Sequence, residues 1–176
     1  MRTKGFHHVA YACRDAEVTR HFYEDLMGFP LVHTEMAALT GPDGSPGFMR
    51  HLFFDAGAGE SIAFFDVHGV GERPDWKSDL SEANGLPVWV NHCAFWADAE
   101  QQERTKARMS ADGIAPLMEI DHGWCHSVYF IDPNGIMVEL CRDTPGLPVD
   151  PATAREMLTQ VPDLAAARAP RAQQTS

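Results

Sequence analysis

Apolar and polar positions follow the same order twice along this chain, and the first half sets the pattern. Val18, Phe22 and Leu26 recur at helical spacing, with Asp15 as the expected N-cap and Gly28 as the expected end of a helix. Four strand-like runs surround this helix and cover residues 6–13, 31–38, 49–55 and 61–67. The predicted order is therefore strand, helix, strand, strand, strand.

The second half repeats this order after a polar segment, residues 68–87, whose Gly, Pro and Asp content predicts a linker or a lid. Asp98 is the expected N-cap of a helix that Gly113 ends. The strand-like runs here cover residues 88–96, 115–120, 126–131 and 136–141. The sequence thus predicts an α+β fold of two βαβββ modules, about 5–67 and 87–142, which form a curved mixed sheet around a ligand site with the helices outside.

The two modules are expected to form a single domain over residues 1–145. The character of the chain changes after Arg142, where Pro145, Pro148 and Pro151 interrupt it. Residues 146–176 are therefore predicted to be a C-terminal extension. It begins with a short helix from Asp150 and Pro151 through Met157, and residues 168–176 are expected to be disordered.

Composition narrows the function. The chain has 176 residues, of which 44% are hydrophobic, and a formal net charge of −11. An acidic surface repels phosphate backbones and anionic lipids, and no apolar stretch has the length of a membrane span, so we expect neither a nucleic-acid nor a membrane partner. The four cysteines have no framework spacing and the N-terminus lacks the apolar core of a signal peptide, which together predict free thiols and a cytoplasmic protein.

Three residues of metal-ligating types stand in predicted strands: His8, His92 and Glu139. Two imidazoles and one carboxylate on rigid strands are the donor set of a facial triad, which leaves coordination positions open for substrate. His8 and His92 occupy equivalent places in the two modules, which favours a shared site over three unrelated structural residues. His7 points to the opposite side of its strand from His8, and we expect a structural role for it.

Four motifs together resemble the vicinal oxygen chelate superfamily, over about residues 5–142. They are His8-Val9-Ala10, the helix containing Phe22-Tyr23 and ending at Leu26-Met27-Gly28-Phe29, His92-Cys93-Ala94-Phe95, and the run from Tyr129 through Asp132-Pro133-Asn134-Gly135 to Glu139-Leu140. The resemblance implies that His8, His92 and Glu139 are the metal ligands. The superfamily includes glyoxalases, epimerases, antibiotic-resistance proteins and extradiol dioxygenases, so fold alone does not choose the reaction.

The resemblance also suggests a reaction. Glyoxalase-like members carry a fourth ligand on the strand equivalent to residues 61–67, where this chain offers no carboxylate that faces the metal. A three-ligand site resembles that of the ring-cleaving extradiol dioxygenases, with Fe(II) as the first choice of metal, Mn(II) second, and Zn(II) or Ni(II) as further alternatives. Tyr129 lies ten residues before Glu139, as the tyrosine of those enzymes does, and is expected to bind a substrate oxygen.

The resemblance suggests further catalytic residues. His122 lies near the place of a dioxygenase histidine that contacts bound dioxygen, with His126 as its competitor. Glu60 falls where many extradiol enzymes carry an acid–base histidine, and a carboxylate serves there if burial raises its pKa. His51 is an alternative base. Each of these residues also has a plain structural reading, as a loop, hairpin or core side chain.

The sequence therefore predicts a metal-dependent dioxygenase for a catechol-like or other vicinal-oxygen small molecule, acting as a homodimer. The alternatives are a glyoxalase-like lyase or isomerase and a resistance protein that binds a small molecule without changing it. Whether the two modules pair within one chain or across a dimer stays open at this point.

Overall fold

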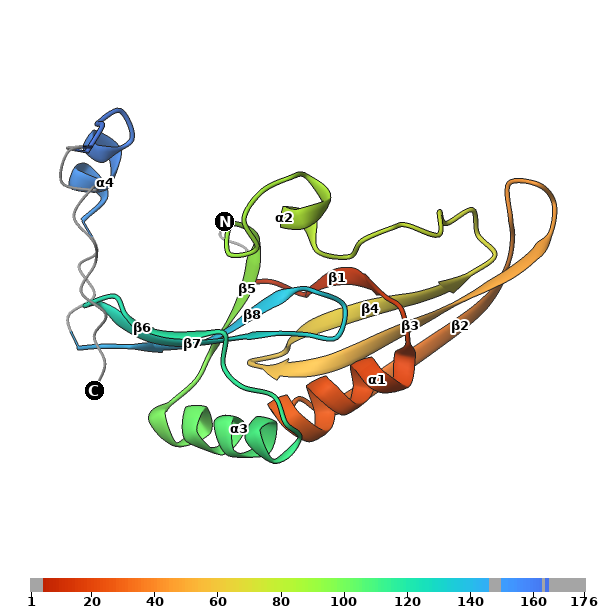
Figure 1. The fold of residues 1–176 in the computed structure, drawn as a ribbon, viewed down its shortest axis with the longest axis horizontal. Helices are drawn as coiled ribbons and strands as arrows, with labels where there is room; N and C mark the ends of the chain where they lie inside the picture. Colours follow the sequence, from red (N-terminus) through yellow and green to blue (C-terminus); the bar gives the residue numbers. More distant parts are fainter. Residues whose placement is uncertain (1–4, 146–149, 163, 165–176) are drawn as a thin grey trace. The chain divides into compact units, whose positions relative to one another are not determined.

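The computed structural model describes residues 5–145, 150–162 and 164, and separates into one compact unit that ends at Thr144 and a second that begins at Pro145. The larger unit holds two copies of the predicted module (Figure 1). The first contains β1 (His8–Cys13), α1 (Ala16–Arg20), the π-helical segment η1 (His21–Met27), β2 (Leu31–Thr40), β3 (Pro46–Gly57) and β4 (Glu60–His68). The second contains β5 (His92–Trp96), α3 (Ala99–Ala111), β6 (Met118–Asp121), β7 (Cys125–Ile131) and β8 (Met137–Asp143).

The module order and the α+β class are confirmed, and each module forms its own open four-stranded sheet. The strand orders are β1-β4-β3-β2 and β5-β8-β7-β6, with the first and last strands of each module pairing in parallel. In the described part of the chain no ladder joins the two sheets, where one continuous curved sheet was expected. The edge strands β1 and β5 meet through side chains instead, with the Tyr11 hydroxyl 3.1 Å from Cys93 Sγ.

Helix termini follow the expected capping chemistry. The Asp15 and Asp98 carboxylates accept hydrogen bonds from Val18 N and Gln101 N, which fixes the starts of α1 and α3. Gly28 follows η1 with φ +83°, the left-handed conformation that favours glycine. A Cβ at this position would lie 3.1 Å from an Arg108 guanidinium nitrogen. Gly28 therefore lets the second helix approach the end of the first.

The helices join the two modules on one side of the sheets (Figure 1). Arg108 of α3 donates to the carbonyl oxygens of Leu26 and Met27 at 2.6 and 3.1 Å, so it satisfies the last carbonyls of η1. Deeper in the unit, the Tyr23 hydroxyl donates to the Asp132 carboxylate at 3.0 Å. Burial raises the pKa of that carboxyl. The turn at Asp132 thus ties the second module to the helix of the first.

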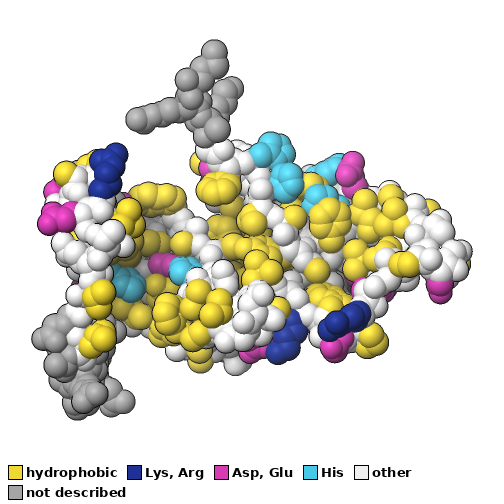
Figure 2. All heavy atoms as spheres, turned by 90° about the horizontal axis from the view of Figure 1, so that it is seen from above, with side chains coloured by type: hydrophobic (Ala, Val, Ile, Leu, Met, Phe, Trp, Pro, Cys, Tyr) yellow, Lys and Arg dark blue, Asp and Glu magenta, His cyan; other side chains and the backbone are white. Residues whose placement is uncertain are grey.

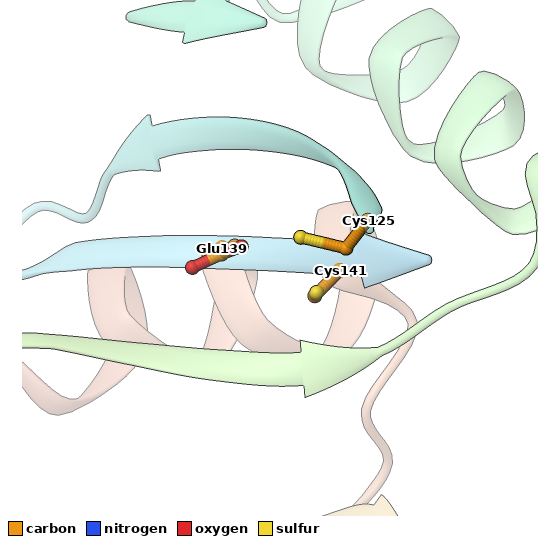
Figure 3. Close-up of side chains that lie close together, drawn as sticks. All are labelled: Cys125, Glu139 and Cys141. Carbon is orange, nitrogen blue, oxygen red and sulfur yellow. The ribbon is translucent and has the colours of Figure 1, made fainter. Parts of the chain in front are cut away.

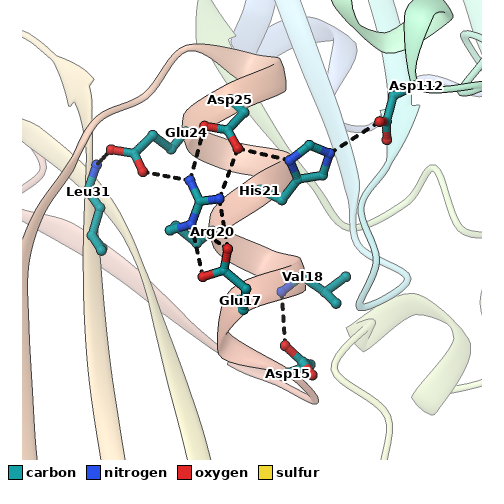
Figure 4. A network of polar contacts seen from close by, with 9 residues as sticks. All are labelled: Asp15, Glu17, Val18, Arg20, His21, Glu24, Asp25, Leu31 and Asp112. Carbon is teal, nitrogen blue, oxygen red and sulfur yellow. Dashed lines mark hydrogen bonds and ion pairs between the residues drawn. The ribbon is translucent and has the colours of Figure 1, made fainter.

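A charged network on the exposed side of the first helix extends to the second module (Figure 4). Arg20 at the end of α1 pairs with three carboxylates, that of Glu17 in α1 and those of Glu24 and Asp25 in η1. His21 bonds Asp25 through Nδ1 at 2.9 Å and Asp112, at the end of α3, through Nε2 at 3.3 Å. Both carboxylates raise the pKa of His21, with Asp25 the larger cause.

The segment between the modules contains an unexpected short helix, α2 (Leu80–Ala83), within the predicted linker of residues 68–87. Asp79 caps it, and the Ser81 hydroxyl accepts a hydrogen bond from Asn91 N at 2.8 Å. Residues 88–91, which were expected to begin a strand, form the approach to β5 instead. This contact places His92 at the first position of β5.

The smaller unit contains α4 (Pro151–Met157), whose first turn is capped by the Asp150 carboxylate. The predicted disorder over residues 168–176 falls outside the described residues. None of the described helices combines the length and apolarity that crossing a membrane requires.

Candidate metal centre

Strand alternation in the second module separates a core face from an open face. Val138 and Leu140 of β8 point into the core, so Glu139 and Cys141 lie on the other side of the strand. The neighbouring strand β7 places Tyr129 opposite Glu139, and Ser127 opposite Cys141. One face of this sheet therefore gathers a carboxylate, a phenol, a hydroxyl and a thiol.

His92 and Glu139 lie against each other on this face. The distance from His92 Nε2 to Glu139 Oε2 is 3.0 Å, and the Ser127 hydroxyl donates to the other carboxylate oxygen. Glu139 is 5% exposed, whereas one third of the His92 side chain is exposed. The pair is thus a buried carboxylate with a histidine between it and the surface.

The second nitrogen of His92 fits a metal ligand. His92 Nδ1 lies 2.9 Å from the carbonyl oxygen of Trp89, which accepts a hydrogen bond from that nitrogen. With Nδ1 as the donor, the ring directs Nε2 at a carboxylate oxygen of Glu139, and a cation held between these two atoms would be attracted to both. A ligating histidine whose other nitrogen donates to a backbone carbonyl is the usual arrangement in metal sites. The donors present here therefore suit a divalent cation.

Tyr129 and His122 form a second pair beside the first. His122 Nε2 lies 3.0 Å from the Tyr129 hydroxyl, and the rings of Tyr129 and His92 are 6.1 Å apart between centroids. Burial raises the pKa of Tyr129, and the Glu139 charge raises it further. The phenol therefore stays protonated at neutral pH and can donate a hydrogen bond next to the carboxylate.

His8 lies in the other sheet, on β1. Its ring centroid is 5.9 Å from that of His51 and 5.3 Å from that of Phe53, and its Nδ1 is 2.7 Å from His7 Nδ1. Within residues 5–145, 150–162 and 164, the only His, Cys, Asp or Glu trio close enough to share an ion is Cys125, Glu139 and Cys141. The structure thus brings His92 and Glu139 together, and it does not bring His8 to them within one chain.

Two of the acid–base candidates belong to the first module. His51 is buried on β3, stacked on Phe65 with 3.8 Å between centroids, and burial lowers its pKa, with His8 as the next cause. Its Nε2 has no hydrogen-bond partner among the described residues. Glu60 accepts a hydrogen bond from Phe6 N at 3.1 Å. Glu60 therefore fixes the chain before β1, while His51 keeps a free nitrogen beside His8.

His126 lies on the wrong side of the sheet for the predicted role. It alternates with Ser127 along β7 and so faces away from Glu139, on the side where α3 packs. Gln102 of α3 donates to its carbonyl oxygen at 2.9 Å. Of the two competing histidines, the structure places only His122 next to Tyr129.

Sequence reasoning missed Ser127 and the pair Cys125 and Cys141 as neighbours of Glu139. The signal was the period of two in β7 and β8, which carries Cys125, Ser127 and Tyr129 to one face.

Figure 2 shows the side of the molecule away from α1 and α3, with histidines in two groups separated by hydrophobic side chains. A cleft of about 820 Å³ also opens at the seam of β1 and β5, where Phe6, Glu60, His92 and Trp96 line it.

Comparison with known proteins agrees with this architecture. Residues 5–140 match the sequence model of the Glyoxalase/Bleomycin resistance protein/Dioxygenase superfamily. Among solved structures, a glyoxalase/dioxygenase from Nostoc punctiforme is 21% identical, with a TM-score of 0.54 and coverage of 80% of this chain and 91% of that one.

Two further structures are similar at the same level. A point mutant of the fosfomycin resistance protein FosX from Listeria monocytogenes, in complex with Mn(II) and 1S,2S-dihydroxypropylphosphonic acid, is 19% identical with a TM-score of 0.53 and coverage of 82% and 96%. Lactoylglutathione lyase from Agrobacterium tumefaciens is 24% identical with a TM-score of 0.50 and coverage of 80% and 95%. Likeness at this identity establishes the fold.

Proposed function

The chain belongs to the Glyoxalase/Bleomycin resistance protein/Dioxygenase superfamily, and from that premise we propose that it is a metal-dependent dioxygenase that cleaves a catechol-like small molecule. The observation that carries the proposal is the meeting of His92, Glu139, Tyr129 and His122 on one face of a sheet. A carboxylate and an imidazole there provide two metal ligands, and a phenol paired with a second imidazole lies beside them.

The third ligand in this proposal is His8 of a second copy of the chain. His8 is exposed on β1 and is too far from Glu139 to share an ion within one chain. A homodimer whose open sheet faces meet would supply it, because a two-fold interface brings each module against its complement. His92, Glu139 and the second copy's His8 would hold a divalent ion, Fe(II) before Mn(II), which would supply Lewis acidity toward vicinal oxygen atoms of the substrate and the capacity to react with dioxygen.

Tyr129 and His122 then act on the substrate side of the ion. The Tyr129 hydroxyl, kept protonated by burial, donates a hydrogen bond to a substrate oxygen. His122 Nε2, 3.0 Å from that hydroxyl, holds it in place or exchanges a proton with it. We therefore expect Tyr129→Phe to lower kcat about 10- to 100-fold with metal content unchanged. Tyr11→Phe, which removes a hydroxyl that is hydrogen-bonded to Cys93 Sγ, is the matched control.

A second candidate function is a glyoxalase-like lyase or isomerase reaction, and His51 favours it. His51 Nε2 has no hydrogen-bond partner among the described residues, and the ring centroids of His51 and His8 are 5.9 Å apart. In this candidate reaction His51 would accept a proton from a substrate held beside His8. Oxygen consumption separates the two reactions. Stoichiometric uptake with a catechol panel under Fe(II) supports dioxygenation, whereas turnover that continues without oxygen supports the isomerase.

Complementation between two inactive variants tests the shared site. We expect His8→Ala and His92→Ala each to lose bound Fe(II) or Mn(II) as pure proteins. When the two are mixed and allowed to exchange subunits, half of the dimers are mixed and each holds one intact site, so about a quarter of the wild-type metal should return. His33→Ala, which removes an exposed histidine of β2, is the control and should keep its metal.

Two results would reject the site shared between His8 of one copy and His92 of the other. Full metal retention by either single variant removes that histidine from the site. Failure of the mixture to regain metal, when mixed dimers are present by mass, shows that the two histidines do not meet across the interface.

A further inference from the structure

Two cysteines on the open face of the second module have no role in the proposed reaction. Cys125 begins β7 and Cys141 lies on β8, where Ser127 is its cross-strand partner. Figure 3 shows both sulfur atoms on the same side of the strands as the Glu139 carboxylate. Their sulfurs and a Glu139 oxygen all lie within 4.8 Å of one another. The chain thus places two thiols and a buried carboxylate around one point.

The spacing is close to what a tetrahedral ion requires. With Zn–S bonds of about 2.3 Å and Zn–O bonds of about 2.0 Å, ligand atoms on a common tetrahedral zinc lie about 3.5 to 3.8 Å apart. An upper limit of 4.8 Å therefore leaves about 1 Å of adjustment, which side-chain rotation of Cys141 can provide. Cys141 is half-buried whereas Cys125 is fully buried, so an ion would enter from the open face past Cys141.

The remaining cysteines show how different this pair is. Cys13 lies in the core, and Cys93 points to the seam between the modules, where its sulfur contacts the Tyr11 hydroxyl. Neither belongs to a trio of possible ligands in the described part of the chain. Cys125 contacts the Ser127 hydroxyl at 3.6 Å, and that hydroxyl donates to Glu139. Cys125 is therefore linked to the Glu139 carboxylate through the Ser127 hydroxyl, and Cys141 Sγ lies within 4.8 Å of both.

We propose that Cys125, Cys141 and Glu139 form a site for a thiophilic divalent cation of the zinc class. Two thiolates and one carboxylate are a donor set that selects soft and borderline ions over Mn(II) or Fe(II). Each thiol releases its proton to solvent as its sulfur binds the ion, and a water molecule completes the tetrahedron. Because Glu139 also faces His92, the soft ion and the proposed functional metal compete for one carboxylate.

Cobalt spectroscopy tests the site with the full chain. Co(II) replaces Zn(II) in tetrahedral sites, and sulfur ligation adds a charge-transfer band in the near ultraviolet. Titrated under a phosphine reductant without oxygen, the wild type should develop this band, and Zn(II) should bleach it. Cys125→Ser and Cys141→Ser should lose most of the band and weaken Zn(II) binding at least about 100-fold. Cys93→Ser is the matched control and should keep it.

The experiment has outcomes that overturn the proposal. A wild-type spectrum without the band, or a band of equal intensity in Cys141→Ser, would show that these thiols bind no ion. Cys141→Ala serves as a second variant at the more open position, and thermal melts confirm that both variants are folded.

This site and the proposed function fail separately although they share Glu139. His92→Ala should keep the charge-transfer band, because His92 is no ligand of the soft ion. If the band persists while complementation between His8→Ala and His92→Ala fails, only the shared histidine site is rejected. If complementation succeeds and the band is absent, only the thiol site is rejected.

Discussion

The two modules have the same backbone and different chemistry. In the first, β1 pairs with β4 so that His8 aligns with Ser61, and Ala10, two residues further along β1, aligns with Ala63. In the second, β5 pairs with β8 so that His92 lies at the place of His8 and Glu139 at the place of Ala63. The repeated backbone thus provides two equivalent places for a carboxylate ligand, and only the second module fills its place.

The neighbouring strands extend the contrast. Phe53 of β3 pairs with Ala63 as Tyr129 of β7 pairs with Glu139, so a phenyl ring stands where the second module has a phenol. One step along, His51 takes the place of Ser127. The first module therefore surrounds its histidine with aromatic rings, and the second surrounds its histidine with hydrogen-bonding groups. The residue types at these three equivalent positions therefore give only the second sheet a buried carboxylate with hydrogen-bonding neighbours.

The largest effect should come from the carboxylate that distinguishes the modules. Glu139→Gln keeps the size of the side chain and removes the charge, so the protein should fold while its affinity for Mn(II) or Fe(II) falls more than about 100-fold. Metal content after dialysis is the measurement. Glu119→Gln is the control, since Glu119 lies in the same sheet but pairs with Lys106 of α3. Unchanged metal content in Glu139→Gln would show that the Glu139 carboxylate is not what distinguishes the second module as a metal site.

The sequence was sufficient for the modules because their signals are local. Asp15, Asp98 and Gly28 mark helix ends through bonds to residues a few positions away, and the strand periods are equally short in range. The register that brings Tyr129 opposite Glu139 also follows from one tight turn, because Asp132 accepts hydrogen bonds from Asn134 N and Ile136 N. Two strands joined by such a turn hold these residues opposite each other.

What the sequence did not settle depends on contacts between elements far apart. His8 and His92 look equivalent along the chain, yet they stand in separate sheets, and His8 is not close enough to Glu139 to share an ion within one chain. The choice between His122 and His126 needed the phase of β7, since one residue of shift moves a side chain to the other face. The alternation along β7 separates His126 from Ser127, and the burial of Val128 and Phe130 in the core shows which of the two faces is turned inward.

The join between the modules offers a stability effect of intermediate size. Tyr23→Phe removes the buried hydrogen bond to Asp132 and leaves that carboxylate with fewer donors, so the free energy of unfolding should fall by about 1.5 to 3 kcal/mol. Chemical denaturation measures the loss. Metal content should stay at the wild-type level, because Tyr23 lies in the core behind both sheets. A drop in metal content with unchanged stability would mean that the contact between Tyr23 and Asp132 controls metal binding. The different side chains at equivalent strand positions would then not explain why the second module binds the metal.

The smallest effect should be pH-dependent and should come from the exposed contact between the same helices. Asp25 and Asp112 raise the pKa of His21 above its ordinary 6.5, so the folded state binds this proton more tightly than the unfolded state. The stabilisation is therefore complete below about pH 6.5 and disappears as the pH rises through the folded-state pKa.

His21→Gln should consequently lower the melting temperature slightly at pH 6 and leave it unchanged at pH 9. Salt should weaken the difference, because His21 and Asp112 are both exposed to solvent. His33→Gln, on β2, is the matched control, since its replacement leaves the helix contact intact. A larger loss at pH 9 than at pH 6 would contradict the assignment. It would mean that α1, η1 and α3 hold the two modules together through apolar packing and the Arg108 contacts, without help from this ion pair.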